Sequence, residues 1–482
     1  MAFRSDALGA DDLWLASADG RQLMRLTTGN LRPHQLTWTR SGQILFLDRE
    51  GTLRVVRPST VSSPTNPGET VPGRIKFEAR LRVERGELFR EMFAESWRKL
   101  RHHFYDPKLH GADWEAVRSK YGAILHHLAC VEDFYDLVSL MLGELNASHL
   151  GIGGRQRSPQ EQTAELGIVW DESYPGPGLR VQEVVKGGPA DRKGLDLRPG
   201  DYVHAIDDVV LGEKVNLSQL LNDKADEPVR LRVSATPMGQ LTRTVEIRAA
   251  RRQDLLNAYY HRWVEQNRRK VEELSGGRLG YIHLRAMDLA SLDEFVRSLY
   301  TDNFDKDGLI IDVRYNGGGF THDQVLAYLG GKEHTYFVTR EGQFGTVLRS
   351  YDRKWTKPLV VLCNNRSFSD AEIFPNAVRE LGLGKLVGLP TGGLVIGTIN
   401  EQLIDGSFFR VPRLGVYTAQ GVNMEKAGVV PDVVVEPNPD DLLRGHDAQL
   451  VKAVQVLQEE VRAYFAKRKP VPIPVPSVSE PR

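Results

Sequence analysis

Cysteine is scarce in this chain, with two residues among 482. Cys130 and Cys363 are far apart and each lies in an apolar stretch, so the sequence excludes a disulfide framework and a cysteine metal site. Long hydrophobic runs are also missing, because no stretch approaches the roughly 20 apolar residues of a membrane span. The segment MAFRSDALGADDLWL at the N-terminus holds no apolar region of the length that a signal peptide needs. We therefore expect a soluble protein of the cytoplasm without a membrane partner.

An excess of charge of either sign is absent as well, because 63 Lys and Arg residues balance 63 Asp and Glu residues. No overall electric field favours binding to nucleic acid or to an anionic membrane, and we expect neither partner. The hydrophobic content of 41% is that of an ordinary globular protein, and the length predicts about three or four domains.

Residues 1–58 are expected to form a single β-propeller-like blade. Short alternating segments are separated by turns at 19–20, 41–42 and 50–51, each ending in glycine, which predicts a four-stranded meander. A lone blade has no neighbouring repeat against which to bury its apolar face. The chain is therefore either a fragment of a longer parent, whose missing part could carry a targeting signal, or its meander docks on the rest of the protein.

The middle of the chain changes pattern three times. Residues 59–73 are a linker rich in Pro, Ser and Thr, and apolar residues at helical spacing then predict a helical domain over 74–160. Residues 164–251 resemble a PDZ domain, with a strand, a short helix beginning at Pro189-Ala190 and a Pro-Gly-Asp turn into another strand. PDZ edges commonly bind an extended peptide as an added strand, although such a domain can also serve only to position its neighbours.

Strands alternate with helices over residues 252–466, which predicts an α/β domain with a partly parallel sheet. Strands are expected at 278–284, 308–314, 358–363 and 385–389, paired strands through 407–418, and helices near 322–330, after residue 369 and over 446–465. The Pro-rich tail over 467–482 is expected to be disordered.

Ser369 stands at the corner where the apolar run PLVVLC ends and a helical segment begins. The pattern Ser-Asp-Ala-Glu fits a capping box, in which the hydroxyl accepts from a helix amide and Glu372 reaches back. The same corner suits nucleophilic catalysis, because a helix N-terminus gives positive potential and the amide of Asp370 lies near any oxyanion formed at that hydroxyl. The Gly-x-Ser-x-Gly pattern of a nucleophile elbow is absent. The residues alone leave both interpretations open.

The stretch DVRYNGGGF places three glycines, residues 317–319, directly after an expected strand. They can be no more than a flexible turn. Ligands, however, bind at the carboxyl ends of parallel strands, and glycine lets backbone N–H groups approach a ligand closely. The loop could therefore supply the second oxyanion donor that acyl transfer requires. It is not a P-loop, since no Gly-Lys-Ser/Thr follows.

His149, in ELNASHLGIGG, follows a helical segment and lies beside small residues, which favours an accessible position. A serine hydroxyl needs a neighbouring base, and His149 could be that base only if the fold brings it within roughly 3 Å of Ser369. The histidine pairs at 102–103 and 126–127 point about 100° apart on their helices and chelate one ion poorly. No His-Glu-x-x-His spacing occurs, so we expect no metal and no organic cofactor.

Five motifs, in order along the chain, resemble those of tricorn proteases and of the C-terminal processing peptidases related to them. They are NASHLG, DVRYNGGGF, SFSDAEIFPNAVRELGLGKLVG, TGGLVIG and NMEKAGVVPDVVVE. The resemblance runs from the blade through the helical region and PDZ domain to the catalytic domain. It implies a multidomain α+β protein whose α/β catalytic domain is of the ClpP/crotonase type.

The resemblance also implies a serine peptidase with a Ser-His-Ser-Glu tetrad. Ser369 matches the nucleophile and His149 the general base. Ser148 lies where the helper serine is expected, and Glu425 matches the acidic member, which reaches the histidine through a serine. Taken alone, Glu425 would be interpreted as a solvated loop residue.

The oxyanion donors of the family fall on the amides of Gly318 and Asp370, although any glycine of 317–319 could be the donor. The processing peptidases use a Ser-Lys dyad, with the lysine in a Thr-x-Gly-Lys-Gly turn. Residues 391–397 read TGGLVIG and contain no lysine, so a histidine-assisted mechanism is preferred.

Two functions stay open at this point. The first is a serine endopeptidase that cleaves oligopeptides or unfolded segments through an acyl-enzyme. The second is a non-catalytic PDZ protein that binds peptides or acts as a scaffold. In either case we expect peptides as partners, and the resemblance implies a homo-oligomer.

Overall fold

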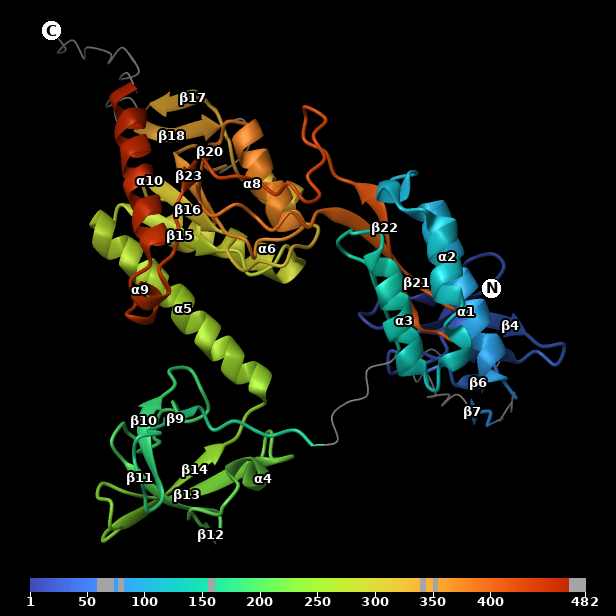
Figure 1. The fold of residues 1–482 in the computed structure, drawn as a ribbon, viewed down its shortest axis with the longest axis horizontal. Helices are drawn as coiled ribbons and strands as arrows, with labels where there is room; N and C mark the ends of the chain where they lie inside the picture. Colours follow the sequence, from blue (N-terminus) through green and yellow to red (C-terminus); the bar gives the residue numbers. More distant parts are fainter. Residues whose placement is uncertain (59–72, 77–81, 155–160, 339–343, 350–353, 468–482) are drawn as a thin grey trace. The chain divides into compact units, whose positions relative to one another are not determined.

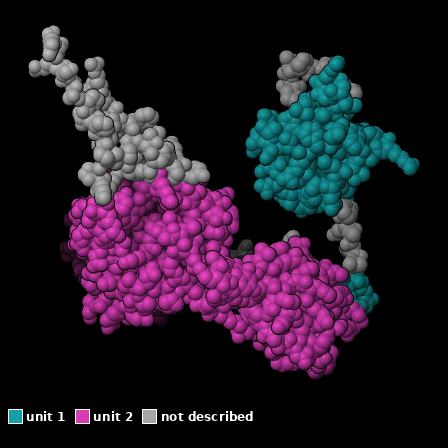
Figure 2. All heavy atoms as spheres, turned by 90° about the horizontal axis from the view of Figure 1, so that it is seen from above, with its two compact units in different colours: residues 1–84 teal, residues 85–482 magenta. Residues whose placement is uncertain are grey.

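The computed structural model describes residues 1–482 except 59–72, 77–81, 155–160, 339–343, 350–353 and 468–482. Residues 1–84 and residues 85–482 form two compact units (Figure 2). The predicted linker and the predicted disordered tail lie almost wholly outside the described residues, since Gly73 begins a strand and Lys467 ends the last helix. Within the described ranges, no helix combines the length and the apolar character needed to cross a membrane.

The described residues of the first unit form two small antiparallel sheets. One has the order β1-β2-β3 and the other β4-β5-β6-β7. Their bounds are β1 Ala2–Ser5, β2 Asp12–Ala16, β3 Leu23–Arg25, β4 His34–Trp38, β5 Ile44–Leu47, β6 Leu53–Val56 and β7 Gly73–Arg74.

The prediction of one continuous four-stranded meander is therefore wrong. Pro33 has no N–H to extend a ladder, and Asn30 and Arg32 have positive φ angles of 57° and 48°, so the chain turns away between β3 and β4. Leu13 and Phe46 nevertheless belong to one apolar core that draws on both sheets.

The helical region is built from α1 Arg85–His103, α2 Trp114–Gly122 and α3 Val131–Gly143, with short 3₁₀ turns at Leu109–Gly111 and Leu125–His127. The helices predicted from apolar spacing are confirmed. They bury a shared core in which Met92, Leu100 and Phe134 are fully inaccessible to solvent.

A three-stranded sheet of order β21-β22-β8 packs on these helices (Figure 1). Its strands are β21 Ile396–Gln402, β22 Phe408–Gly415 and β8 Gly151–Gly153. The paired strands predicted through 407–418, which we placed in the α/β domain, form as β22 and its partner β21, and β22 also pairs with β8 of the helical region. Phe409 and Val411 lie on the same side of β22, and the helical region supplies the apolar partners that bury them.

The PDZ-like region forms an antiparallel sheet of order β14-β13-β11-β10-β9, with β12 paired to β11. Its elements are β9 Ile168–Trp170, β10 Leu179–Val184, β11 Tyr202–Ile206, β12 Val209–Val210, α4 Leu217–Leu221, β13 Pro228–Ser234 and β14 Thr242–Arg248. No helix begins at Pro189-Ala190, which corrects our prediction. These residues lie in a turn where Asp191 N donates to Gly188 O and no helical ladder follows.

The α/β region has a parallel sheet of order β15-β16-β19-β20-β23, with helices on both faces (Figure 1). The strands are β15 Leu279–His283, β16 Gly308–Asp312, β19 Leu359–Cys363, β20 Gly384–Gly388 and β23 Val433–Val434. The helices α5 Arg252–Ser275 and α10 Ala448–Lys467 pack on one face, and α6 Leu289–Ser298, α7 His322–Ala327 and α8 Asp370–Glu380 pack on the other. The remaining elements are a π-helical turn at Leu299–Asn303, β17 Glu333–Val338, β18 Phe344–Arg349 and α9 Pro439–Leu443.

Every residue of β15, β16 and β19 is buried, as expected for strands covered on both faces. Because these strands are parallel, their carboxyl ends lie at one edge of the sheet. The glycine loop follows β16 and the turn that contains Ser369 follows β19, so the sheet topology brings these two segments together.

Candidate active site

Ser369 lies in the turn between β19 and α8 with φ 55° and ψ −120°. A positive φ is strained for serine, and an ordinary N-cap residue has an extended backbone instead. Glu372 Oε1 accepts from the Ser369 amide at 3.2 Å, as the predicted capping box requires, yet the Ser369 hydroxyl makes no cap hydrogen bond among the described residues. The half-buried hydroxyl is thus available for another role, on the strained strand-to-helix turn that nucleophile elbows also use.

Gly318 is the glycine of the loop that touches this turn. A Cβ at position 318 would lie 2.6 Å from Ser369 Cβ and 2.7 Å from Phe368 O, whereas a Cβ at Gly317 would meet nothing within 4 Å. The φ of Gly318 is +96°, which glycine adopts without the steric cost of a side chain. The close approach therefore singles out Gly318 among the three glycines as the neighbour of Ser369.

Two backbone amides lie beside Ser369. The Asp370 amide, at the first position of α8, has no hydrogen-bond partner in the part of the chain that the structure describes. The Gly318 amide donates to Asn316 Oδ1 at 2.8 Å. An oxyanion would therefore find one unoccupied donor and one that is shared with the buried Asn316 side chain.

His149, Ser148 and Glu425 form a connected hydrogen-bond chain, although the first two come from the helical region and Glu425 from a loop after β22. Ser148 Oγ lies 2.7 Å from His149 Nδ1 and donates to Glu425 Oε2 at 3.0 Å. The Ser148 amide donates to Glu425 Oε1 at 2.8 Å. Glu425 is 7% exposed, so it is not the solvated loop residue that its local sequence suggests.

This chain determines the tautomer of the histidine. Since the Ser148 hydroxyl gives its proton to Glu425, it accepts from His149 Nδ1–H, which leaves Nε2 of a neutral ring unprotonated. Burial lowers the pKa of His149, the charge of Arg410 lowers it further, and Glu425 partly opposes both. The neutral ring that a general base requires therefore persists below the usual pKa of histidine.

Residues 394 and 395 connect the two halves of the site. Ser369 N donates to Leu394 O at 3.0 Å, and Val395 N donates to Glu425 Oε2 at 2.9 Å. Among the described residues, no hydrogen bond joins the His149 ring directly to the Ser369 hydroxyl. The hydrogen bonds thus link the backbone of Ser369 to Glu425, Ser148 and His149 through residues 394 and 395.

Asp370 also has a side-chain role that sequence reasoning missed. Its Oδ1 lies 2.5 Å from His322 Nδ1, and its Oδ2 accepts from the His322 amide at 3.1 Å. The Asp370 carboxylate beside the ring raises the pKa of His322, although burial of the ring opposes this. The signal in the sequence was a histidine directly after the glycine loop, in GGGFTH. The pair ties the start of α7 to the start of α8 next to Gly318.

A buried ion pair lies at the end of β16, directly before the glycine loop. Arg314 and Asp312 are 3% and 0% exposed, and their closest N–O distance is 2.7 Å. Arg314 Nη1 also donates to Asp447 at 2.7 Å, just before α10. Burial alone would raise the pKa of Asp312, but the charge and hydrogen bonds of Arg314 hold it below its usual value.

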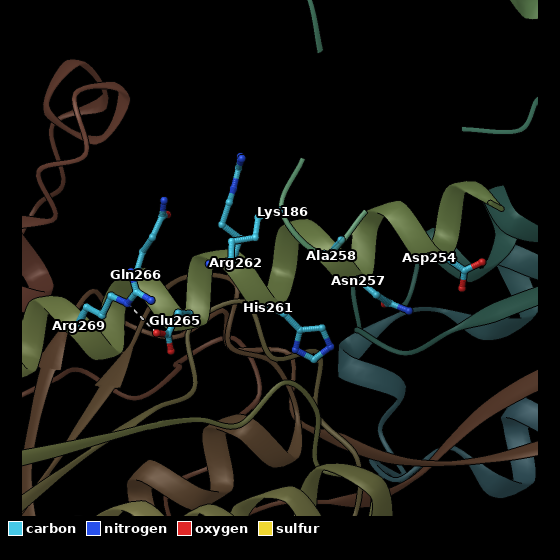
Figure 3. Close-up of a pocket in the computed structure, with 10 residues that line it drawn as sticks. Lys186, Asp254, Asn257, Ala258, His261, Arg262, Glu265, Gln266 and Arg269 are labelled. Carbon is cyan, nitrogen blue, oxygen red and sulfur yellow. Dashed lines mark hydrogen bonds and ion pairs between the residues drawn. The ribbon is translucent and has the colours of Figure 1, made fainter. Parts of the chain in front are cut away.

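A separate groove of about 570 Å³ runs along α5 beside the turn that follows β10 (Figure 3). It is lined by polar and charged side chains such as Lys186, His261, Arg262 and Glu265. None of the predicted catalytic residues lines it. In the described ranges, no group of three or more His, Cys, Asp or Glu side chains is placed to hold a metal ion.

Three family models match consecutive parts of the chain. They are the tricorn protease C1 domain over residues 86–143, the tricorn protease PDZ domain over 177–251 and peptidase family S41 over 278–435. These ranges contain the helical core, the antiparallel sheet with β10 to β14, and the parallel sheet with Ser369 and Glu425.

Known proteins with similar sequences also include tricorn proteases and their homologues. The chain is 29% identical to "Tricorn protease homolog 1" of Streptomyces coelicolor, over 89% of this chain and 40% of that protein. It is 30% identical to "Tricorn protease" of Thermoplasma acidophilum, over 78% of this chain and 35% of that protein. The crystal structure of the tricorn protease matches with a TM-score of 0.78 and 27% identity, covering 95% of this chain and 44% of that one. The chain thus spans less than half the length of these relatives.

Proposed function

Because the chain is a tricorn-protease-like member of peptidase family S41, with C1 and PDZ domains, we propose that it cleaves oligopeptides or unfolded polypeptide segments as a serine endopeptidase. The observation that carries this proposal is the hydrogen-bond chain from His149 through Ser148 to the buried Glu425, which joins the turn of Ser369 through residues 394–395.

In this proposal Ser369 is the nucleophile and His149 the general base. The hydroxyl attacks the peptide carbonyl carbon while Nε2 takes its proton, and the imidazolium then protonates the leaving amine. Water attacks the resulting ester with the same base, which releases the acid product and the free hydroxyl. Ser148 and Glu425 hold the ring in the Nδ1–H tautomer and stabilise its charged form. In this proposal, substrate binding brings Nε2 within hydrogen-bond reach of the hydroxyl, since catalytic hydrogen bonds are often longer without substrate.

The Asp370 and Gly318 amides bind the oxyanion. Asp370 N–H is unoccupied among the described residues, and Gly318 N–H is released from Asn316 or shared with it. A Cβ at position 318 would overlap Ser369 Cβ and Phe368 O, so only glycine fits beside the proposed nucleophile.

The test is to replace Ser369 with alanine. We expect cleavage of fluorogenic peptides to fall to background while the thermal unfolding temperature is unchanged, because alanine removes one oxygen that makes no cap hydrogen bond. A serine-directed fluorophosphonate should label the wild-type chain at Ser369, as located by mass spectrometry. Turnover by the alanine variant equal to that of the wild type would contradict the nucleophile assignment.

A second candidate is a non-catalytic peptide-binding protein, and one groove favours it. The groove, of about 480 Å³, is lined by Ile168 and Trp170 of β9 and by Leu217 and Leu221 of α4. Peptide binding at this groove without fluorophosphonate labelling of the wild type would favour this candidate. We also propose self-association, which sedimentation velocity of the purified chain tests directly.

A further inference from the structure

We propose that Glu372 is a positioning residue that clamps residues 391–395. On one side of this segment is the nucleophile turn, residues 364–369, and on the other is the histidine relay of His149, Ser148 and Glu425. The inference rests on the function proposed above and assigns to Glu372 a role that a capping box does not require. A capping box needs one hydrogen bond from this side chain, back to the N-cap amide.

Four donors from two segments converge on the Glu372 carboxylate. Oε1 accepts from Ser369 N at 3.2 Å and from Leu394 N at 2.8 Å. Oε2 accepts from Gly393 N at 2.7 Å and from the Thr391 hydroxyl. Glu372 is 0% exposed, so water does not compete for these oxygens. Three of the four donors belong to residues 391–394, outside the helix that the capping box serves.

The clamped segment holds both halves of the proposed site. Leu394 O accepts from the Ser369 amide, and Val395 N donates to Glu425 Oε2, the same oxygen that accepts from the Ser148 hydroxyl. A displacement of residues 393–395 would therefore move Glu425 relative to Ser369. Glu372 determines this distance because it binds both the nucleophile turn and the segment.

Glutamine at position 372 would disrupt the clamp in either orientation of its amide. Each carboxylate oxygen of Glu372 accepts from two donors, whereas the NH₂ group of glutamine cannot accept a hydrogen bond. In one orientation the NH₂ group faces the amides of Ser369 and Leu394, and in the other it faces the Gly393 amide and the Thr391 hydroxyl. The side-chain volume is nearly unchanged, so the effect reports hydrogen bonding and charge rather than packing.

Thr391 offers a milder test of the same clamp. Its hydroxyl donates to Glu372 Oε2 and accepts from Val429 N at 2.7 Å. Valine keeps the branched shape and removes both hydrogen bonds, whereas serine keeps the hydroxyl. The pair T391V and T391S therefore separates the hydroxyl from the shape of the side chain.

The experiment measures fluorophosphonate labelling and peptide turnover per titrated site for the wild type, E372Q, T391V and T391S. E380Q serves as the control, because Glu380 is an exposed residue on the same helix that accepts only from Gln420 Nε2 among the described residues. We expect kcat per titrated site to fall roughly a hundredfold in E372Q, as for a nucleophile misplaced by about 1 Å, with KM little changed. We expect about a tenfold fall in T391V, because only one of its two lost hydrogen bonds reaches Glu372, and wild-type rates in T391S and E380Q.

Measuring kcat per titrated site separates a loss of catalytic geometry from a loss of folded protein. If Glu372 were only structural, E372Q would reduce the number of sites that titrate while each remaining site worked at the wild-type rate, and the proposal would be wrong. If E372Q does not fold, T391V decides, and a rate equal to that of T391S overturns the clamp. Wild-type labelling that S369A lacks is measured first, so a failure of the proposed function is recognised before the variants of the clamp are compared.

Discussion

Replacing Gly318 with alanine probes the contact between the glycine loop and the nucleophile turn. The added Cβ would lie 2.6 Å from Ser369 Cβ, 2.7 Å from Phe368 O and 3.0 Å from Asp370 N. Non-bonded carbon atoms prefer separations of roughly 3.5–4.0 Å, so the turn must move by about 1 Å. Two of these three atoms are backbone atoms, so rotation of a side chain cannot relieve the overlap.

The magnitude follows from two costs. The φ of +96° strains any residue with a side chain, and this strain adds to the overlap, so the free energy of unfolding should fall by about 2–4 kcal/mol. Displacement of the hydroxyl or of the Asp370 amide by about 1 Å should lower kcat roughly a hundredfold. The change leaves the Gly318 N–H in place, so the loss reports geometry and not a missing donor.

The assay is turnover of a fluorogenic peptide together with thermal unfolding, and Gly317→Ala is the matched control. A Cβ at Gly317 meets nothing within 4 Å, so we expect kcat within about twofold of the wild type for that variant. A folded Gly318→Ala variant with wild-type turnover would refute the contact between the loop and the nucleophile. Equal losses in both variants would show that the loop as a whole, and not this contact, matters.

Three further predictions address the relay and its support. Ser148→Ala breaks the link between the ring and Glu425, so kcat should fall roughly a hundredfold with KM retained; an unchanged kcat would contradict the relay. In the proposed mechanism the neutral ring of His149 is the active form. Burial and then the charge of Arg410 lower its pKa, so the acid limb of kcat/KM should lie below pH 6.5 in the wild type and move to higher pH in Arg410→Gln; a shift to lower pH would contradict the effect assigned to Arg410. Arg314→Met leaves Asp312 buried without its partner and should lower the free energy of unfolding in urea by about 3–5 kcal/mol, whereas a loss below about 1 kcal/mol would mean that Asp312 is neutralised by other groups.

The strands of the parallel sheet were predictable because they are buried on both faces. The runs GLIID and LVVLC are apolar from end to end, and the structure forms β16 and β19 from them. The helices of the C1 region were predictable from apolar spacing for a similar reason, since each has one face in a shared core. We predicted one meander across the break between β3 and β4, although Pro33 lies there, because short alternating strands do not show which strand pairs with which.

The candidate site also contains some residues that the local sequence indicated and others that it did not. The corner after β19 indicated Ser369, and three glycines after β16 indicated a donor loop, because both features depend on neighbouring residues. Glu425 could be selected only through the resemblance to tricorn proteases, since its own loop is polar and gives no sign of burial. His322 escaped notice because its partner Asp370 is 48 positions away.

By itself, the sequence determined the buried strands of the parallel sheet, the amphipathic helices of the helical region and the residues with reactive side chains, because these properties depend on nearby residues. The tertiary structure alone decided that Glu425 is buried beside Ser148, 277 positions away, and that the hairpin of β21 and β22 packs on the helical region. The physical reason is that desolvation and hydrogen bonding act across space, and no local pattern specifies which distant surface will cover a given side chain.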